Sequence, residues 1–179
     1  MENIKLGISS CLFGLKVRYD GGHRHDKLLM DVLGASVQYV SVCPEVECGL
    51  GVPREAMRLE GDTSCPRLVT ISTKKDMTDS LRIWAYKRVE QLETENLCGF
   101  IFKSDSPSCG IKRVKVYNDD GMPVKAGAGI FARIFMEHFP LLPVEDEAGL
   151  HDLQLRGTFM ERIFALKREH IPAKKESPK

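Results

Sequence analysis

The sequence predicts an α/β protein built on a mostly parallel sheet with helices on both faces. Short runs rich in β-branched and aromatic residues alternate with helix-length segments, which is the order expected when helices connect parallel strands. The run at 97–104 is almost wholly apolar, as strands are when both faces of their sheet are covered. No repeat or linker divides the chain, so we expect a single domain over 1–170 and a disordered tail over 171–179.

The N-terminal part predicts two strands separated by one helix. NIKLGISS, at 3–10, is apolar enough to be a short buried strand, and SVQYVSV, at 36–42, is β-branched and aromatic. The helix is expected over 27–34, because Asp26 is a suitable N-cap residue and Gly34 is a typical terminator. The turn-rich segment before Asp26 is expected to be a loop.

The middle of the chain predicts two more strands and the clearest helix. RLVTIST at 67–73 and LCGFIFKS at 97–104 have strand composition, whereas the Gly- and Pro-rich segment 43–55 is expected to be a loop. The segment 76–95 between the two strands is expected to be helical, because its apolar residues recur at helical spacing. These residues are Leu81, Trp84, Ala85, Val89 and Leu92.

The C-terminal part is expected to end in helices. The segment 111–127 has the pattern of a strand, a turn at Asp120-Gly121 and an extended stretch. Helices are expected at 129–139 and 150–169, with a short strand at 141–145 between them.

Composition limits the classes of function. Lys plus Arg number 26 and Asp plus Glu number 25, so no global basic field would attract nucleic acid or an anionic membrane, although KRVK at 112–115 is a modest basic segment. No signal-peptide pattern and no apolar run of membrane-spanning length occurs, so we expect a cytoplasmic protein. Because cytosolic cysteines stay reduced, the six cysteines are more useful for metal binding or catalysis than for disulfides.

Three cysteines follow the ends of predicted strands. Cys11, Cys43 and Cys109 each come directly, or within a few residues, after a strand, and the carboxyl ends of parallel strands are where α/β sheets bind ligands. Each lies among Gly, Pro and Ser residues, whose backbone can approach a ligand closely. Three soft ligands suit an iron-sulfur cluster or a zinc ion with an open position. The alternative is that these cysteines are small buried apolar residues.

The other three cysteines have weaker patterns. Cys98 lies inside an apolar strand and is expected in the core, and Cys65, which precedes a proline, is either a loop thiol or a core residue. Cys48 forms a C-x4-C pair with Cys43, but no second C-x2-C element accompanies it, so we do not expect it to be a ligand.

Five segments together resemble a bacterial family that was first described only as a domain of unknown function, and whose members are described as thiouracil desulfidases. The segments are ISSCLFGLKVRYDGGH, VCPEVECGLGVPRE, KSDSPSCG, GAGIFAR and DLQLRGTFMERI. The resemblance implies an oxygen-sensitive 4Fe-4S cluster at the strand ends, held by Cys11, Cys43 and Cys109, with the fourth iron open. It also implies a small thiolated pyrimidine as substrate, such as 2-thiouracil, which is converted to uracil and hydrosulfide without net electron transfer.

This chemistry needs proton transfer, and Glu45 is the best placed acid or base because it follows Cys43 by two residues. Ser106 and Ser108, beside Cys109, are expected to assist catalysis by hydrogen bonding. The alternative is that the carboxylate and the hydroxyls only satisfy backbone groups of their turns.

The loop before the first helix offers groups that suit a planar heterocycle. Arg18, Tyr19, Asp20 and His23 are expected to stack on the substrate or bond to its edge, and Ser10 is expected to bind it from the end of the first strand. The alternative is an ordinary turn.

One motif resembles a dinucleotide-binding sequence. Gly127, Gly129 and Ala132 fit G-x-G-x-x-A, but only about 50 residues follow, too few for the rest of such a fold. We therefore interpret it as a tight entry into a helix whose N-terminus remains able to bind an anion.

Two other functions fit the same residues. The first is the same reaction on thiouridine in RNA, which the near-zero net charge disfavours. The second is a non-enzymatic protein with a structural or redox-sensing metal, for which Cys48 is the nearest fourth ligand. The sequence makes no prediction of the oligomeric state.

Overall fold

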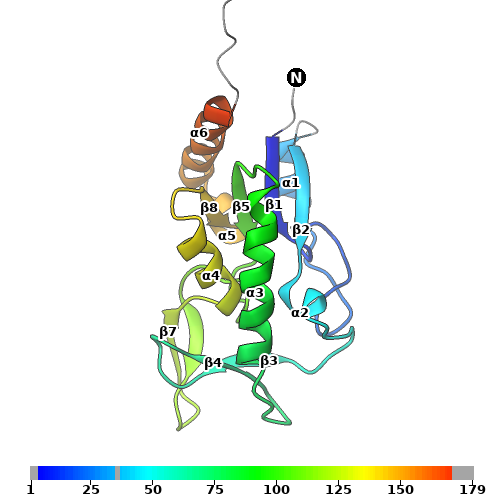
Figure 1. Ribbon diagram of the computed structural model, residues 1–179, viewed down its shortest axis with the longest axis vertical. Helices are drawn as coiled ribbons and strands as arrows, with labels where there is room; N and C mark the ends of the chain where they lie inside the picture. Colours follow the sequence, from blue (N-terminus) through cyan, green and yellow to red (C-terminus); the bar gives the residue numbers. More distant parts are fainter. Residues whose placement is uncertain (1–3, 35–36, 171–179) are drawn as a thin grey trace, which may run out of the picture.

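The computed structural model describes residues 4–34 and 37–170, and the predicted disordered tail at 171–179 lies outside them. Four parallel strands form sheet A in the order β2-β1-β5-β8 (Figure 1). They are β1 (Ile4–Ser9), β2 (Val37–Val42), β5 (Gly99–Phe102) and β8 (Val144–Asp146). Because β1 pairs with β2 on one side and β5 on the other, the strand order reverses at β1, which is where such sheets open a ligand-binding crevice.

Helices cover both faces of sheet A, which confirms the predicted fold class. They are α1 (Lys27–Leu33), α3 (Thr78–Glu93), α4 (Ile130–His138) and α6 (Leu153–His170). One core cluster joins Phe100 and Phe102 of β5 to α3 and α4, and the other joins Ile8 and Ile101 to α1 and α6. The side chains of β5 thus point alternately into two cores, which explains why the whole strand is apolar.

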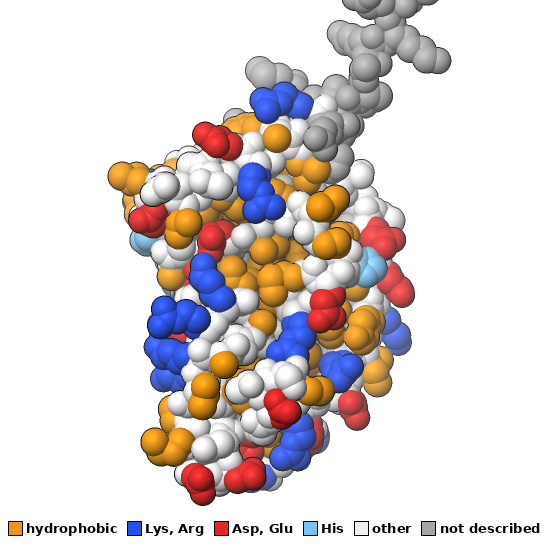
Figure 2. All heavy atoms as spheres, turned by 90° about the vertical axis from the view of Figure 1, so that its left-hand side faces the viewer, with side chains coloured by type: hydrophobic (Ala, Val, Ile, Leu, Met, Phe, Trp, Pro, Cys, Tyr) orange, Lys and Arg blue, Asp and Glu red, His pale blue; other side chains and the backbone are white. Residues whose placement is uncertain are grey.

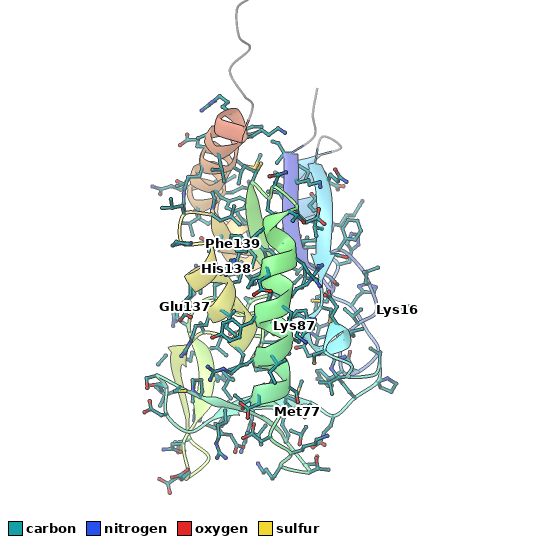
Figure 3. The ribbon with its side chains drawn as sticks, viewed as in Figure 1. Lys16, Met77, Lys87, Glu137, His138 and Phe139 are labelled. Carbon is teal, nitrogen blue, oxygen red and sulfur yellow. The ribbon has the colours of Figure 1, made fainter. Side chains whose placement is uncertain are left out.

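Aromatic rings pack between β5 and α4 on the face of sheet A that α3 and α4 cover. The rings of Phe100 and Phe102 stack with centroids 4.2 Å apart, and Phe135 of α4 meets Phe100 edge-on at 4.7 Å. At the C-terminal ends of the two helices, His138 of α4 lies 2.6 Å from Glu93 of α3, and Figure 3 shows the labelled His138 and Phe139 beside α3. The two helices therefore run in the same direction along the sheet.

A second sheet was not anticipated. Sheet B has the order β4-β3-β6-β7 and lies at the lower end of the molecule in Figure 1, below the carboxyl ends of sheet A. Its strands are β3 (Met57–Glu60), β4 (Arg67–Thr70), β6 (Val114–Tyr117) and β7 (Pro123–Gly127). The turn predicted at Asp120-Gly121 connects the antiparallel pair β6 and β7. Two short helices, α2 (Pro44–Glu47) and α5 (Glu147–Leu150), were also not predicted.

The surface carries both signs of charge. Figure 2 shows basic and acidic side chains interspersed with apolar ones over one face. Among the described residues, no helix is both long and apolar enough to cross a bilayer.

The G-x-G-x-x-A motif enters a helix, as predicted, and also clamps the loop of Cys109. α4 begins after Gly129, and the backbone N–H groups of Ile130 and Ala132 donate to the carbonyl oxygens of Pro107 and Ser108 at 3.2 and 3.0 Å. These carbonyls satisfy N–H groups that a helix N-terminus otherwise leaves free. The N–H groups at the start of α4, which were expected to be able to bind an anion, are therefore occupied by carbonyl oxygens of the Cys109 loop.

We predict that Gly129→Ala destabilises the protein by about 1–3 kcal/mol, since a Cβ atom at this position would lie 2.4 Å from the carbonyl carbon of Ser108. Chemical denaturation measures the change in the free energy of unfolding. Gly157→Ala is the matched control, because a Cβ atom there meets nothing within 4 Å and alanine favours helix α6. Equal stability of Gly129→Ala and the wild type would contradict the close contact between Gly129 and the backbone of Ser108.

Candidate functional site

The structure brings the three predicted cysteines to one cavity of about 430 Å³ at the carboxyl ends of β1, β2 and β5. Cys43 follows β2 directly and is 8% exposed, whereas Cys109 lies on the loop after β5 and is 4% exposed. Cys11, after β1, is half-buried. The switch point of the sheet thus gathers thiols that are far apart in the sequence.

Local hydrogen bonds fix the backbone of each cysteine loop. The N–H of Ser10 donates to the carbonyl of Val42 at 2.9 Å, which joins the ends of β1 and β2. The N–H of Cys43 donates to the side chain of Glu47 at 2.9 Å, and the N–H of Cys109 donates to the Ser106 hydroxyl at 3.0 Å. The thiols are therefore presented by ordered turns.

Burial controls the acidity of these thiols. It raises the pKa of Cys11, raises that of Cys43 to about 12, and raises that of Cys109 well above the usual value. Glu45 adds to this effect at all three, while Lys103 opposes it at Cys11. The cysteines are neutral thiols when free, and a bound soft metal is what deprotonates such groups.

Glu45 stands next to these thiols and ends a chain of polar groups. Its Oε1 accepts a hydrogen bond from the buried Ser108 hydroxyl, which lies 3.0 Å from the Ser106 hydroxyl at the cavity wall. Its Oε2 lies 3.5 Å from the Cys43 sulfur and 3.7 Å from Arg54. The three residues predicted to be catalytic are thus connected to one another.

The predicted substrate-binding residues divide into two groups. Ser10, Arg18 and Tyr19 line the cavity. Asp20 and His23 are exposed and are not among the lining residues. The chain turns away there: Asp20 accepts a hydrogen bond from the Gly22 N–H at 2.9 Å, which lowers the pKa of its carboxyl, and His23 accepts one from the His25 N–H at 3.1 Å.

Three basic residues that line the cavity, Arg24, Arg54 and Lys103, were not predicted as site residues. Arg54 donates through Nη1 to the carbonyl of Val17 at 2.9 Å, and Lys103 contacts Glu147 of α5. Arg54 lies in the same Gly- and Pro-rich segment as Cys43 and Glu45, which was the available signal. Lys103 directly follows β5 and opens the segment KSDSPSCG, which was the available signal for it.

The other cysteines lie away from the cavity wall. Cys98 is buried in the core of the α1 and α6 face, as predicted, and Cys65 is exposed. The sulfur of Cys48 donates to the carbonyl of Glu45 at 3.3 Å, and Cys48 packs against the other core. None of these three residues is among those that line the cavity.

The donor set fits an iron-sulfur cluster, because it consists of soft cysteine sulfurs. Within residues 4–34 and 37–170, no three His, Cys, Asp or Glu side chains gather closely enough to hold one metal ion. A cubane cluster binds each thiolate through a different iron atom, so its ligands stand farther apart. Cys11, Cys43 and Cys109 line a common cavity from three loops and offer three thiols of the kind that bind such a cluster.

Comparisons with known proteins agree with this chemistry. The family model described as 2-thiouracil desulfurase matches residues 6–147. The uncharacterized protein YbbK of Bacillus subtilis (strain 168) is 31% identical over 109 residues, which are 58% of this chain and 71% of YbbK. Among solved structures, the 4Fe-4S-dependent thiouracil desulfidase TudS matches with a TM-score of 0.68 and 29% identity, over 87% of this chain and 99% of TudS.

We predict that Ser108→Ala lowers the free energy of unfolding by about 1–3 kcal/mol, because the buried hydroxyl is the hydrogen-bond donor to Glu45 and a partner of Ser106. The exposed Ser80 of α3 provides the control, since Ser80→Ala should change stability by less than about 0.5 kcal/mol. Denaturant titration measures both. A Ser108→Ala protein as stable as Ser80→Ala would show that the hydroxyl chain contributes nothing to the fold.

Proposed function

The chain belongs to the 2-thiouracil desulfurase family, and on this premise we propose that it hydrolyses 2-thiouracil, or a related small thiolated pyrimidine, to uracil and hydrosulfide. The observation that carries the proposal is the convergence of Cys11, Cys43 and Cys109 on one cavity beside Glu45. The likeness to TudS over 87% of the chain supports the same reaction.

Cys11, Cys43 and Cys109 would hold a 4Fe-4S cluster. Bound through three thiolates, such a cluster supplies one iron with a free position, a Lewis acid suited to a soft thiocarbonyl sulfur. Cys48 is not proposed as a fourth ligand, because its sulfur hydrogen-bonds to the Glu45 carbonyl away from the cavity wall.

Glu45 would carry the proton transfers. The thiopyrimidine and water give the oxopyrimidine, in which the water oxygen replaces the sulfur, together with hydrosulfide and a proton. One carboxyl can therefore take a proton from the attacking water and return one to the departing sulfur. The Ser108 hydroxyl orients the carboxyl, and the Ser106 hydroxyl continues the chain to the cavity wall. No electron is gained or lost.

The cavity would hold the ring between Tyr19, Arg18 and Ser10. Its volume of about 430 Å³ lies in the range of small-molecule sites. The guanidinium of Arg18 lies 5.4 Å from the centre of the Tyr19 ring, so the pair presents a cationic and an aromatic surface to a planar ligand.

The first test of this function is the metal content and activity of anaerobically reconstituted protein. We predict about four irons and four sulfides per chain and release of uracil from 2-thiouracil. Cys11→Ala, Cys43→Ala and Cys109→Ala should each lose most of the iron and the activity, because each removes a thiolate ligand.

Cys48→Ala, Cys65→Ala and Cys98→Ala are the controls, compared on folded protein, and should keep their iron. Bound zinc without acid-labile sulfide would contradict the proposal. Loss of the cluster from Cys48→Ala would do so too, because the fourth iron would then carry a protein ligand.

A second test separates catalysis from assembly. Glu45→Gln should keep the iron content and the melting temperature, yet lower the rate of uracil release by about 10²- to 10⁴-fold, since it removes the exchangeable proton of the carboxyl. Glu137→Gln, on the exposed surface of α4, is the control and should behave as the wild type (Figure 3). A Glu45→Gln protein with its full cluster and a near wild-type rate would assign the proton transfers to another residue.

A further inference from the structure

The two glutamates of α2 point to different sides of this short helix. Successive residues of an α-helix are rotated by about 100°, so Glu45 and Glu47 lie roughly 200° apart around the axis. Glu45 lines the cavity, whereas Glu47 faces the neighbouring α3, where its Oε2 lies 3.0 Å from the Nε of Arg88 (Figure 1). The proposed chemistry uses Glu45 and gives no role to Glu47.

Glu47 holds both backbone polar groups of Cys43. Its Oε1 accepts a hydrogen bond from the N–H of Cys43 at 2.9 Å, and its own N–H donates to the carbonyl of Cys43 at 2.9 Å. A hydrogen bond to an ionised carboxylate is among the stronger ones in proteins. The carboxylate of Glu47 is therefore bonded through one oxygen to the backbone of a proposed cluster ligand and paired through the other with α3.

Arg88 connects this segment to a helix that is firmly packed. α3 has 16 residues and buries an apolar face in the core, whereas α2 has only four residues and is too short to be stable without outside contacts. The side chains of Arg88 and Glu47 are 19% and 29% exposed, so their charges are partly shielded from solvent. The Nε of Arg88 makes no hydrogen bond, so the contact is an ion pair.

We propose that Glu47 and Arg88 are positioning residues for Cys43, which keep its sulfur in place as a ligand and so slow the loss of the cluster. Displacement of α2 would move this sulfur and the carboxyl of Glu45 together, because Glu45 lies two residues after Cys43 on the same helix. The inference rests on the proposed function in that it takes Cys43 as a cluster ligand.

The first measurement is made on metal-free protein, by hydrogen exchange of the peptide that contains Cys43. We expect Glu47→Ala to speed its exchange by about 10- to 100-fold, because a hydrogen bond to a charged acceptor is lost. Glu47→Gln keeps an acceptor oxygen but loses the ion pair, and Arg88→Met loses the same pair, so each should speed exchange by only about 2- to 5-fold. Exchange in β5 is the internal reference and should not change.

The second measurement is the rate at which anaerobically reconstituted protein loses iron to a chelator. The variants should rank in the same order as in hydrogen exchange. The double variant of Glu47→Gln and Arg88→Met should lose iron no faster than the faster single variant, because both changes remove one and the same ion pair.

Glu95→Ala is the matched control. It removes the ion pair with Lys5, whose atoms are 2.9 Å apart and whose side chains are 31% and 36% exposed. Glu95 comes after α3 and before the amino end of β5, so its loss should leave both the exchange of the Cys43 peptide and the loss of iron as in the wild type.

Rates in Glu47→Ala that equal those of Glu95→Ala would overturn the inference. Equally faster exchange in β5 would do so too, because Glu47 would then only support the fold as a whole. If Glu47→Ala does not fold, Glu47→Gln and Arg88→Met decide the question, and rates equal to those of the control would overturn it. Failure of the wild-type protein to bind a cluster would instead overturn the proposed function, which the exchange measurement on metal-free protein does not test.

Discussion

The rest of the site depends on the docking of the Cys109 loop against the N-terminus of α4. Gly129 permits this contact because it lacks a Cβ atom, and the first N–H groups of the helix hold the loop carbonyls. The loop in turn presents Ser108 to Glu45, whose carboxyl lies beside the Cys43 sulfur. A helix that packs through Phe131 and Phe135 against the central strand thus sets the position of groups on two separate segments, the Cys109 loop and the segment of Cys43 and Glu45.

Residues of sheet B form part of the wall of the cavity that lies at the carboxyl ends of the strands of sheet A. Met57 of β3 and Ile71, just after β4, line the cavity, and the N–H of Ile71 donates to the carbonyl of Ala56 at 2.9 Å. The side chain of Glu55 accepts hydrogen bonds from the N–H and the hydroxyl of Thr73, both at 2.7 Å, which holds the turn after β4. These contacts enclose the carboxyl ends of the parallel strands, so a ligand there is partly removed from water, where hydrogen bonds to it become stronger.

The sequence predicted the parts of the structure that depend on strong local patterns. β1, β2, β5 and α3 have continuous or periodic apolar residues, and the three cysteines could be placed because each follows a strand of this kind. β4, β6 and β7 lie in segments that were predicted to be extended, but β3 was not predicted, and the pairing of these strands into a second sheet was missed because they are short and partly exposed: in β7, four of the five residues are exposed. Arg54 and Lys103 were missed because their roles depend on tertiary contacts, and Asp20 and His23 were expected in the cavity although the loop turns them outward.

The central claim is that Cys11, Cys43 and Cys109 hold one cluster with an open iron, and the iron anomalous signal of an anaerobically grown crystal tests it most directly. The account predicts a single group of iron atoms inside the cavity, in contact with these three sulfurs and with no fourth protein ligand. Iron bound elsewhere, or coordinated by a fourth side chain such as Cys48 or Glu45, would contradict it.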